Sequence, residues 1–487
     1  MRRFRICYPL GILLLFLSGA MLISTVWSLP EGGKDFPAFL WSSLLTAGIG
    51  LLFYRLFLPY RPEQFSLMES FSLVTLAWFL AGLFGALPFY FFGLFEGSFL
   101  EAFFESISGF TTTGATLIED VESLPRGLLF WRSFTQWLGG MGIIVLSVAI
   151  LPRFGFRSPA MFKAELPGPM SERIVPRVAE TARRLWLIYL SLTALLTALL
   201  YLSGVGFFDS LAHALATIPT GGFSTFNASV GSLQNPAVEI IIAIFMFAAG
   251  INFMLYYRLF RGEPGKVVED EELRFYFFST SIAILLITIN IYPHLAGSLA
   301  KSMRQGAFQV ISILTSTGYV TADYDTWPHF ARALLFLLMF MGACGASTGG
   351  GIKQVRLLIL FKYAFRELYR LIHPSAVSSV KLGGEPLSEE MMRGVAAFTF
   401  FYLLIFAVST LALCGMGLDL TTAASTAASA LGNIGRGLGR VGPLFTYRVI
   451  PPAGLLLLSI IMILGRLEIF TVLVLLLPVS KYFNRRV

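Results

Sequence analysis

Long apolar segments separated by short polar ones run along the whole chain. Ten segments are long enough to cross a membrane: 6–27, 36–58, 67–93, 129–151, 184–205, 236–260, 274–296, 331–365, 394–416 and 450–478. A helix needs about 20 apolar residues to span ~30 Å of hydrocarbon at 1.5 Å per residue. Before each of the fourth, sixth, eighth and tenth lies a semi-apolar segment of about a dozen residues, too short to cross, followed by glycine, threonine and serine.

This hydropathy pattern repeats. A hairpin is followed by four copies of the same unit, in which a helix, a short re-entrant helix, a polar segment and a second helix follow one another. The sequence therefore predicts an all-α polytopic membrane protein with four pseudo-fourfold repeats around one central pore. The predicted boundaries are 1–62 for the N-terminal hairpin and 63–160, 161–262, 263–372 and 373–487 for the repeats.

Composition agrees with a membrane protein. The 487 residues are 56% hydrophobic and only 13% charged, whereas a typical soluble domain is about a quarter charged. The basic start resembles a signal peptide, but its apolar part is long enough to span, and we interpret it as a retained first helix. The cysteines and histidines show no metal-ligand spacing.

The net charge of +8 is first of all a topology signal, because Lys and Arg concentrate in cytoplasmic loops. Most of these residues follow the even-numbered spans, so both termini are predicted to be cytoplasmic and the four polar segments to lie on the outer side. The basic segments 152–184 and 362–393 are long enough to dock a partner. No nucleic-acid partner is expected.

The four polar segments share one feature, a glycine that brings them into register. They read "FESISGFTTTGATLIED" (104–120), "LAHALATIPTGGFSTF" (211–226), "AFQVISILTSTGYVTADY" (307–324) and "AASTAASALGNIGRGLG" (423–439). Irregular backbone is tolerated at membrane depth only where it lines a cavity or is buried in protein. Glycine permits positive φ, which turns successive carbonyls the same way to replace the hydration shell of a cation.

A ring of neutral carbonyls suits a weakly hydrated monovalent cation, and potassium is the first choice because no carboxylate stands beside the glycines. The alternative is that the segments are ordinary glycine-rich turns, which four copies in one topological position disfavour. The predicted potassium-binding residues are Thr112, Thr113, Gly114, Thr220, Gly221, Gly222, Ser316, Thr317, Gly318, Asn433, Ile434 and Gly435.

The stretches "SISGFTTTGAT", "TGGFST", "TSTGYVTADYDTWP", "LGNIGRGLG" and "GRLEIFT" resemble the Trk/Ktr/HKT potassium transporter superfamily, most closely its bacterial TrkH-type membrane subunits, from about residue 66 to 478. The resemblance implies potassium uptake through a single-chain filter, a homodimer in the bacterial cytoplasmic membrane, and a cytosolic nucleotide-binding partner of the TrkA type. Arg436 stands where the family pattern has proline, so its side chain must turn away or reduce conductance.

The eighth span contains "GACGASTGGGIKQVR" (342–356). Each interior glycine costs a helix roughly 0.5–1 kcal/mol relative to alanine, so we expect a break at mid-membrane and a loop below the third polar segment. The resemblance implies that this loop, with Gly345, Gly349, Gly350 and Gly351, is an intramembrane gate. The alternative is close helix packing through small residues.

Arg466, in the last span, is a charge at bilayer depth and needs a partner. Glu468 is two residues away and would not face it on a helix, so carbonyls of the glycine loop are the expected partners; the alternative is snorkelling to the cytoplasmic edge. The hypothesis is that Arg466 latches the loop and limits cation flow.

Other polar residues carry weaker expectations. Lys353 and Arg356 directly follow the glycine loop. They are expected either to anchor the chain at the cytoplasmic side or to take part in gating, and the sequence favours neither role over the other. Asn252 is expected to make a hydrogen bond between helices. Glu105 and His213 are expected to pack and cap rather than to bind ions.

No Ser/His or His/Asp/Glu cluster has catalytic spacing, so the chain is not expected to be an enzyme. No GxGxxG or P-loop motif is present, and regulation by nucleotide must therefore act through another chain. A coupled carrier remains the alternative within transport, although carriers usually combine two inverted halves.

Overall fold

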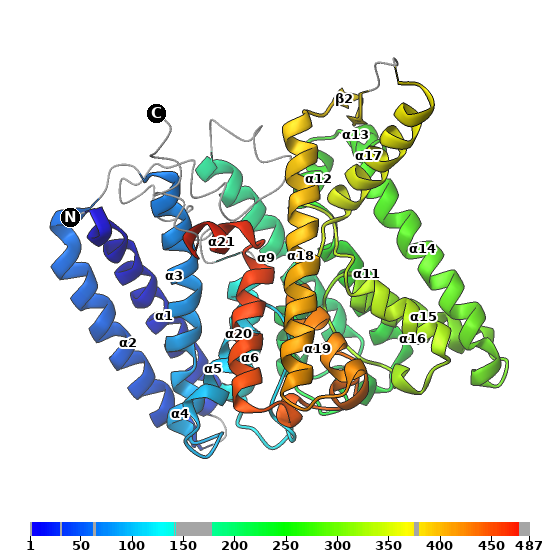
Figure 1. Cartoon of the computed structure of the whole chain (residues 1–487). Coiled ribbons are helices and arrows are strands. Elements are labelled where there is room, and N and C mark those ends of the chain that lie inside the picture. Colours follow the sequence, from blue (N-terminus) through cyan, green and yellow to red (C-terminus); the bar gives the residue numbers. More distant parts are fainter. Residues whose placement is uncertain are drawn as a thin grey trace.

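The computed structural model describes residues 2–29, 32–61, 65–140, 142, 178–374 and 379–476. Within these ranges the chain is almost wholly helical, and Figure 1 shows the long helices side by side with shorter helices between them. The predicted all-α membrane fold is confirmed. Short 3₁₀ helices lie at Arg2–Ile6, Leu58–Tyr60, Ser229–Leu233, Tyr292–Leu295, Tyr324–Thr326, Gly439–Val441 and Tyr447–Val449.

The N-terminal hairpin consists of α1 (Cys7–Ser28) and α2 (Phe36–Phe57), at one edge of the molecule in Figure 1. Two glycines let the helices approach closely. A Cβ on Gly50 would lie 3.0 Å from the Leu15 nitrogen, and one on Gly11 would lie 2.9 Å from the Gly50 oxygen. The hydroxyls of Ser18 and Ser43 meet 2.9 Å apart across the same contact, so small residues and hydroxyls hold the hairpin together.

Six helices of the described residues are long and apolar enough to cross a membrane. They comprise α1, α2, α3 (Leu67–Gly85) continued by α4 (Leu87–Phe92), α9 (Val178–Leu202), α14 (Glu271–Ile291) and α18 (Glu389–Gly415). The sequence predicted a span at each of these places. The predicted fourth span begins as α6 (Arg126–Gly140), and its remainder lies outside the described residues.

Four short helices stand between the spans, as predicted: α5 (Phe99–Phe110), α10 (Phe207–Thr217), α15 (Leu299–Leu314) and α19 (Leu420–Gly432). Polar side chains start three of them. Ser98, Ser298 and Asp419 accept hydrogen bonds from the backbone N–H groups at the third position of the helix, which satisfies donors that a helix leaves unpaired at its first turn. Each short helix ends inside the protein at a glycine-containing segment.

The predicted sixth span, 236–260, is apolar enough to cross a membrane but is bent, which the sequence did not predict. It consists of α11 (Pro236–Ala249) and α12 (Phe253–Phe260), which meet at 93°. Asn252 caps α12 by accepting from the Met254 nitrogen at 2.9 Å, in place of the expected hydrogen bond between helices. The bend frees backbone groups that join the glycine loop: the Cys344 nitrogen donates to the Gly250 carbonyl, and the Phe253 nitrogen donates to the Ala346 carbonyl.

The predicted break in the eighth span is confirmed, because α16 (His329–Leu338) and α17 (Gln354–Ile372) flank the glycine loop. The last span is also broken, which the sequence did not predict. α20 (Pro452–Arg466) and α21 (Phe470–Leu476) are separated at Glu468 and Ile469, which have φ values of 54° and 50°.

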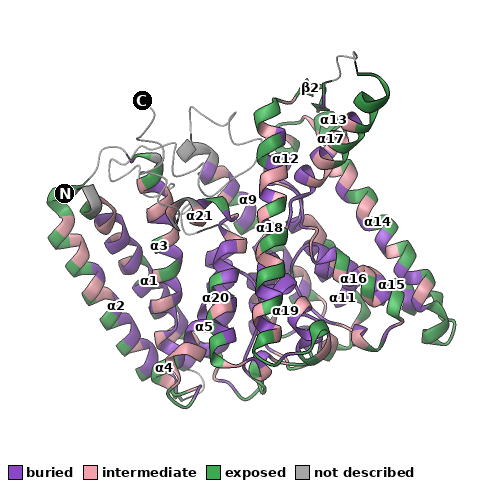
Figure 2. Cartoon of the chain, in the orientation of Figure 1, coloured by how far each residue is buried: buried purple, intermediate pink, exposed green. Residues whose placement is uncertain are grey.

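Burial follows the expected membrane pattern. Figure 2 shows the buried residues gathered around α5, α19 and α20, whereas α2, α14 and α18 carry exposed positions along their length. Many exposed side chains are large and apolar, such as Leu411 and Phe277, as lipid contact requires. On one end lie α13 (Pro264–Val268) and a two-stranded hairpin of β1 (Lys381–Leu382) and β2 (Glu385–Pro386). Most of the basic segment 152–184 and the end of the chain after 476 lie outside the described residues.

Replacing Gly50 with Leu should weaken the hairpin, because overpacking typically costs about 1–3 kcal/mol. We expect a lower thermal unfolding temperature of the purified chain in detergent. Gly48→Leu is the matched control, since nothing lies within 4 Å of a Cβ at Gly48 on the same helix. Equal unfolding temperatures for the two variants would contradict the packing role of Gly50.

Candidate functional site: a ring of four glycine-containing segments

The loops that follow α5, α10, α15 and α19, here called the ring segments, share one backbone conformation. Each has a left-handed residue two positions before its glycine and a positive φ at the glycine itself. The pairs are Thr112 and Gly114, Thr220 and Gly222, Ser316 and Gly318, and Asn433 and Gly435, with φ values between 53° and 58° for the first member and between 76° and 86° for the second. The register is the one that the sequence predicts.

The residue before each glycine donates its N–H back to the preceding short helix. These bonds are 2.8–2.9 Å long, and they run from Thr113 to Ser108, from Gly221 to Ala216, from Thr317 to Ser312 and from Ile434 to Ser429. These bonds satisfy carbonyls at the helix ends, as left-handed C-terminal caps usually do. The carbonyls of the ring residues are thereby left for other partners.

The ring segments contact one another in a closed cycle. At each ring glycine, an added Cβ would lie about 2 Å or less from a carbonyl oxygen of the next segment. The distances are 2.1 Å from Gly114 to Gly221, 1.8 Å from Gly222 to Thr317, 1.9 Å from Gly318 to Ile434 and 2.1 Å from Gly435 to Thr113. The fourth segment thus returns to the first. These four positions require glycine for two reasons: their φ is positive, and the neighbouring carbonyl leaves no room for a Cβ.

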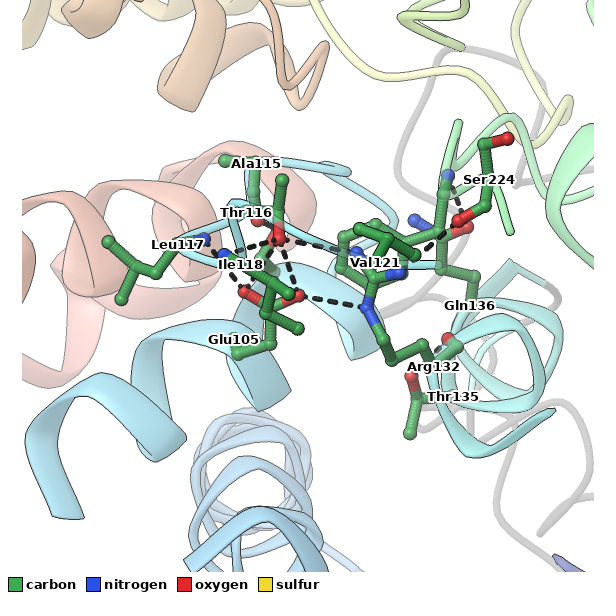
Figure 3. Close-up of polar contacts among 12 residues, drawn as sticks. Glu105, Ala115, Thr116, Leu117, Ile118, Val121, Arg132, Thr135, Gln136 and Ser224 are labelled. Atoms are coloured by element: carbon green, nitrogen blue, oxygen red, sulfur yellow. Dashed lines mark hydrogen bonds and ion pairs between the residues drawn. The ribbon is translucent and has the colours of Figure 1, made fainter. Parts of the chain in front are cut away.

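A buried ion pair joins the first two segments (Figure 3). Glu105 on α5 accepts from the Nε of Arg132 on α6 at 3.0 Å, and it also accepts from the Thr116 hydroxyl and the Leu117 nitrogen. Arg132 reaches the second segment through the Ser224 carbonyl at 3.2 Å. Glu105 therefore packs and caps, as expected, and its charge is neutralised by Arg132.

Tyrosines join the other segments. The Tyr319 hydroxyl donates to the Phe223 carbonyl at 3.3 Å, the Tyr324 hydroxyl donates to the Gly437 carbonyl at 3.1 Å, and the Tyr447 nitrogen donates to the Thr116 carbonyl at 2.9 Å. His213 also packs rather than facing an ion, with its ring nitrogens at 2.8 Å from the Asp209 carbonyl and 3.0 Å from the Ser224 hydroxyl.

Arg132 was not predicted from the sequence, although a signal was available. It is a charge inside a predicted span, and the argument that singled out Arg466 applies to it equally. Tyr319 and Tyr324 gave no such signal, because a tyrosine in an apolar protein is unremarkable until its hydroxyl partner is known.

Outside the ring, the loops of the first two segments are also linked. The Asn227 amide donates to Asp120 at 3.0 Å and accepts from the Val121 nitrogen at 2.7 Å. The hydrogen bond from Asn227 lowers the pKa of the Asp120 carboxyl, so this outer carboxylate stays charged.

The glycine loop lies directly against the ring. The Gly350 nitrogen donates to the Ser316 hydroxyl at 2.6 Å, and a Cβ on Gly350 would lie 2.2 Å from the Gly432 carbonyl oxygen. The Thr348 hydroxyl donates to the carbonyls of Ile218 and Ala249. The loop therefore contacts the ends of α10, α11 and α19 as well as the third ring segment, beside which it was predicted to lie.

Arg466 fastens this loop to the end of α6. Its guanidinium donates to the Thr348 carbonyl at 2.7 Å and to the carbonyls of Gly139 and Gly140 at 2.9 Å. The expected contact with the glycine loop is present. Glu468, beyond the helix end, pairs instead with Arg356, and the Lys353 ammonium donates to the Gly349 carbonyl. Lys353 thus contacts the glycine loop, and Arg356 contacts the chain break between α20 and α21.

Glu272, buried at the start of α14, holds both arms of the loop. One carboxylate oxygen accepts from the Gly345 nitrogen at 2.6 Å and from the Val355 nitrogen at 3.0 Å. This residue was not singled out from the sequence, because it stands among other acidic residues in "EDEEL".

The sequence is similar to one known family over most of its length. A family model described as TrkH, a cation transport protein, matches residues 54–485. The chain belongs to the TrkH family. It is 41% identical over 473 residues to the Trk system potassium uptake protein TrkH of Escherichia coli (strain K12), covering 96% of this chain and 97% of the relative. It is 37% identical over 415 residues to TrkG of the same organism, covering 85% of each.

A solved TrkH structure agrees with the fold. The crystal structure of the potassium transporter TrkH from Vibrio parahaemolyticus matches with a TM-score of 0.89 at 36% sequence identity, covering 98% of this chain and 99% of that one. The predicted family is confirmed, and the chain is a multi-pass membrane protein.

In this TrkH-family chain, Arg436 immediately follows the glycine of the fourth segment. Its guanidinium donates to the Phe445 carbonyl at 2.9 Å. This bond ties the Arg436 side chain to the loop that contains Phe445.

Replacing Glu105 with Gln should destabilise the TrkH-family fold, since breaking a buried ion pair costs about 3–5 kcal/mol. The measurement is thermal unfolding of the purified chain. The matched control is Glu119→Gln, on the outer loop, whose carboxylate is 3.9 Å from Arg448 and 71% exposed; such a change is expected to stay within about 0.5 kcal/mol. A Glu105 variant as stable as this control would show that the ion pair does not hold the segments.

Proposed function

We propose that the chain takes up potassium ions through the centre of the ring. The observation that carries the proposal is the closed cycle of contacts, in which each ring glycine meets the carbonyl of the next segment. Four segments of one conformation, arranged in a cycle, can present their carbonyls to a cation on a common axis. The relatives named Trk system potassium uptake proteins support potassium as the transported ion.

Electrostatics favours a cation there. Each short helix ends at a ring segment, and the C-terminal end of a helix carries a partial negative charge. The buried carboxylate of Glu105, on the helix before the first ring segment, is already paired with Arg132. The ring therefore attracts a cation through dipoles without a net negative charge, which suits a monovalent ion that must also leave.

The proposed ligands are the carbonyl groups and hydroxyls of the twelve residues predicted from the sequence. They are Thr112, Thr113, Gly114, Thr220, Gly221, Gly222, Ser316, Thr317, Gly318, Asn433, Ile434 and Gly435. The four repeats with the boundaries given above would each supply one quarter of this filter.

The proposed gate consists of the glycine loop, with Gly345, Gly349, Gly350 and Gly351, together with Arg466. Support comes from the contacts of the loop with Ser316 and Gly432 beneath the ring and from the bonds of Arg466 to both the loop and α6. A loop in this position obstructs the path, and Arg466 holds it there with charge-assisted hydrogen bonds, which are stronger than neutral ones.

We further propose that the chain works as a homodimer in the cytoplasmic membrane, with both termini inside, and that a cytosolic nucleotide-binding subunit of the TrkA type regulates it. The relatives are named as parts of a Trk system, which supports additional components. The chain itself would act as a transporter without catalysis and without an organic cofactor.

Uptake of labelled rubidium into liposomes that carry the purified chain and high internal potassium tests this function. Arg466→Ala should raise uptake about tenfold or more, because losing even one charged hydrogen bond of ~1.5–3 kcal/mol shifts a closed population by that factor. Arg304→Ala, whose partner is Glu239 at 3.2 Å, is the control and should not raise uptake. Adding sodium or changing pH outside separates a passive pore from a coupled carrier. Absence of rubidium uptake by both the native chain and the Arg466 variant would refute the proposal.

Replacing Gly318 with Ser should reduce the preference for potassium over sodium by about tenfold, since a side chain at positive φ stores roughly 1–3 kcal/mol of strain and would meet the Ile434 carbonyl. The preference is measured from competition of the two ions with rubidium uptake. Gly297→Ser is the control, because Gly297 has a φ of 70° but lies in an outer loop. An unchanged ion preference would remove the third segment from the filter.

A further inference from the structure

Two of the ring segments are braced by pairs of threonine hydroxyls. The hydroxyls of Thr111 and Thr113 lie 2.8 Å apart in the first segment, and those of Thr315 and Thr317 lie 2.8 Å apart in the third. Each pair ties the residue at the end of the short helix to the residue before the ring glycine. In the fourth segment, the Asn433 amide donates to the Thr113 hydroxyl and to the Met462 carbonyl at 3.0 Å.

The second segment has no such side chains. Pro219 and Gly221 stand at the positions of the two threonines, and neither carries a polar side-chain atom. The space is nevertheless filled. A Cβ on Gly221 would lie 2.4 Å from the Cδ of Gln136, so the amide of this α6 residue lies where a threonine side chain at position 221 would begin.

Gln136 also makes hydrogen bonds to the second segment. Its Nε2 donates to the Gly221 carbonyl at 2.7 Å, and its Oε1 accepts from the Phe223 nitrogen at 3.1 Å. A carbonyl only accepts and a backbone N–H only donates, so both partners fix the same orientation of the amide. Gln136 is fully buried, and water does not compete for these bonds.

We propose that Gln136 is a positioning residue that replaces, from α6, the threonine missing from the second segment and holds the Gly221 carbonyl in the ring. This inference rests on the proposed function of the ring as a potassium filter. Among the described residues, no other side chain donates to the corresponding carbonyls of Thr113, Thr317 and Ile434. The geometry of one quarter of the filter thus depends on a residue outside it.

Potassium binding to the purified full chain provides the test, measured as the rise in unfolding temperature with potassium or sodium concentration. A ligand that binds only the folded state raises its stability, and this readout does not require the gate to open. Gln136→Ala should weaken the apparent potassium affinity about tenfold, in keeping with one lost buried hydrogen bond, and should lower the ratio of potassium to sodium affinity.

The matched control is Gln309→Ala. Gln309 is a buried glutamine on α15, and its amide donates to the Thr321 hydroxyl at 3.3 Å rather than to a ring carbonyl. This variant should keep the native potassium affinity. If Gln136→Ala does not fold, Gln136→Met keeps the side-chain volume without the amide and is measured in its place.

A rescue experiment separates this role from general packing. Gly221 has no positive φ, so its backbone accepts a threonine once Gln136 is shortened. Gly221→Thr alone should impair the chain because of the contact with Gln136, whereas the double variant Gln136→Ala and Gly221→Thr should recover at least half of the lost affinity, on a logarithmic scale.

Native affinity and ion ratio in the Gln136 variants, or a double variant weaker than both single variants, would overturn the inference. Gly318→Ser in the same assay distinguishes a failure of the role proposed for Gln136 from a failure of the proposed filter. If Gly318→Ser weakens the potassium response and Gln136→Ala does not, only the role of Gln136 is refuted. If neither changes it, the filter itself is refuted.

Discussion

Backbone groups inside a membrane must find partners within the protein, and this requirement shapes the whole molecule. The four short helices end in the interior, and the N–H groups that follow turn back to satisfy the helix ends. Carbonyls of the same segments lie against the glycines of the neighbouring segments, where only glycine permits so close an approach. The long helices, the ion pair of Glu105 and Arg132 and the tyrosine bonds support this central arrangement.

Hydropathy and glycine spacing were sufficient to predict most helices, the four ring segments and the break in the eighth span. Each of these depends on a local pattern. The bend after α11 was missed because "AAGIN" is apolar and has a single glycine, so its hydropathy does not differ from that of a straight helix. The partnership of Arg356 with Glu468 was missed because 112 residues separate them, and Gln136 because nothing in α6 indicates that the second segment lacks a threonine.

The cycle is fourfold in backbone conformation but not in the side chains that hold it. An ion pair, tyrosine hydroxyls, threonine pairs and a glutamine amide each support a different part. A single chain permits this, because each ring segment has its own sequence. The segments can therefore differ in their side chains wherever another element supplies the missing bond.

The bend between α11 and α12 and the glycine loop between α16 and α17 complete each other. Each break leaves backbone groups without helical partners. Two hydrogen bonds pair these groups, one from the Cys344 nitrogen to the Gly250 carbonyl and one from the Phe253 nitrogen to the Ala346 carbonyl. The loop cannot be displaced alone without leaving polar groups of α11 and α12 unpaired in an apolar interior. Displacing the loop would break both of these bonds, so the position of the loop and the bend between α11 and α12 depend on each other.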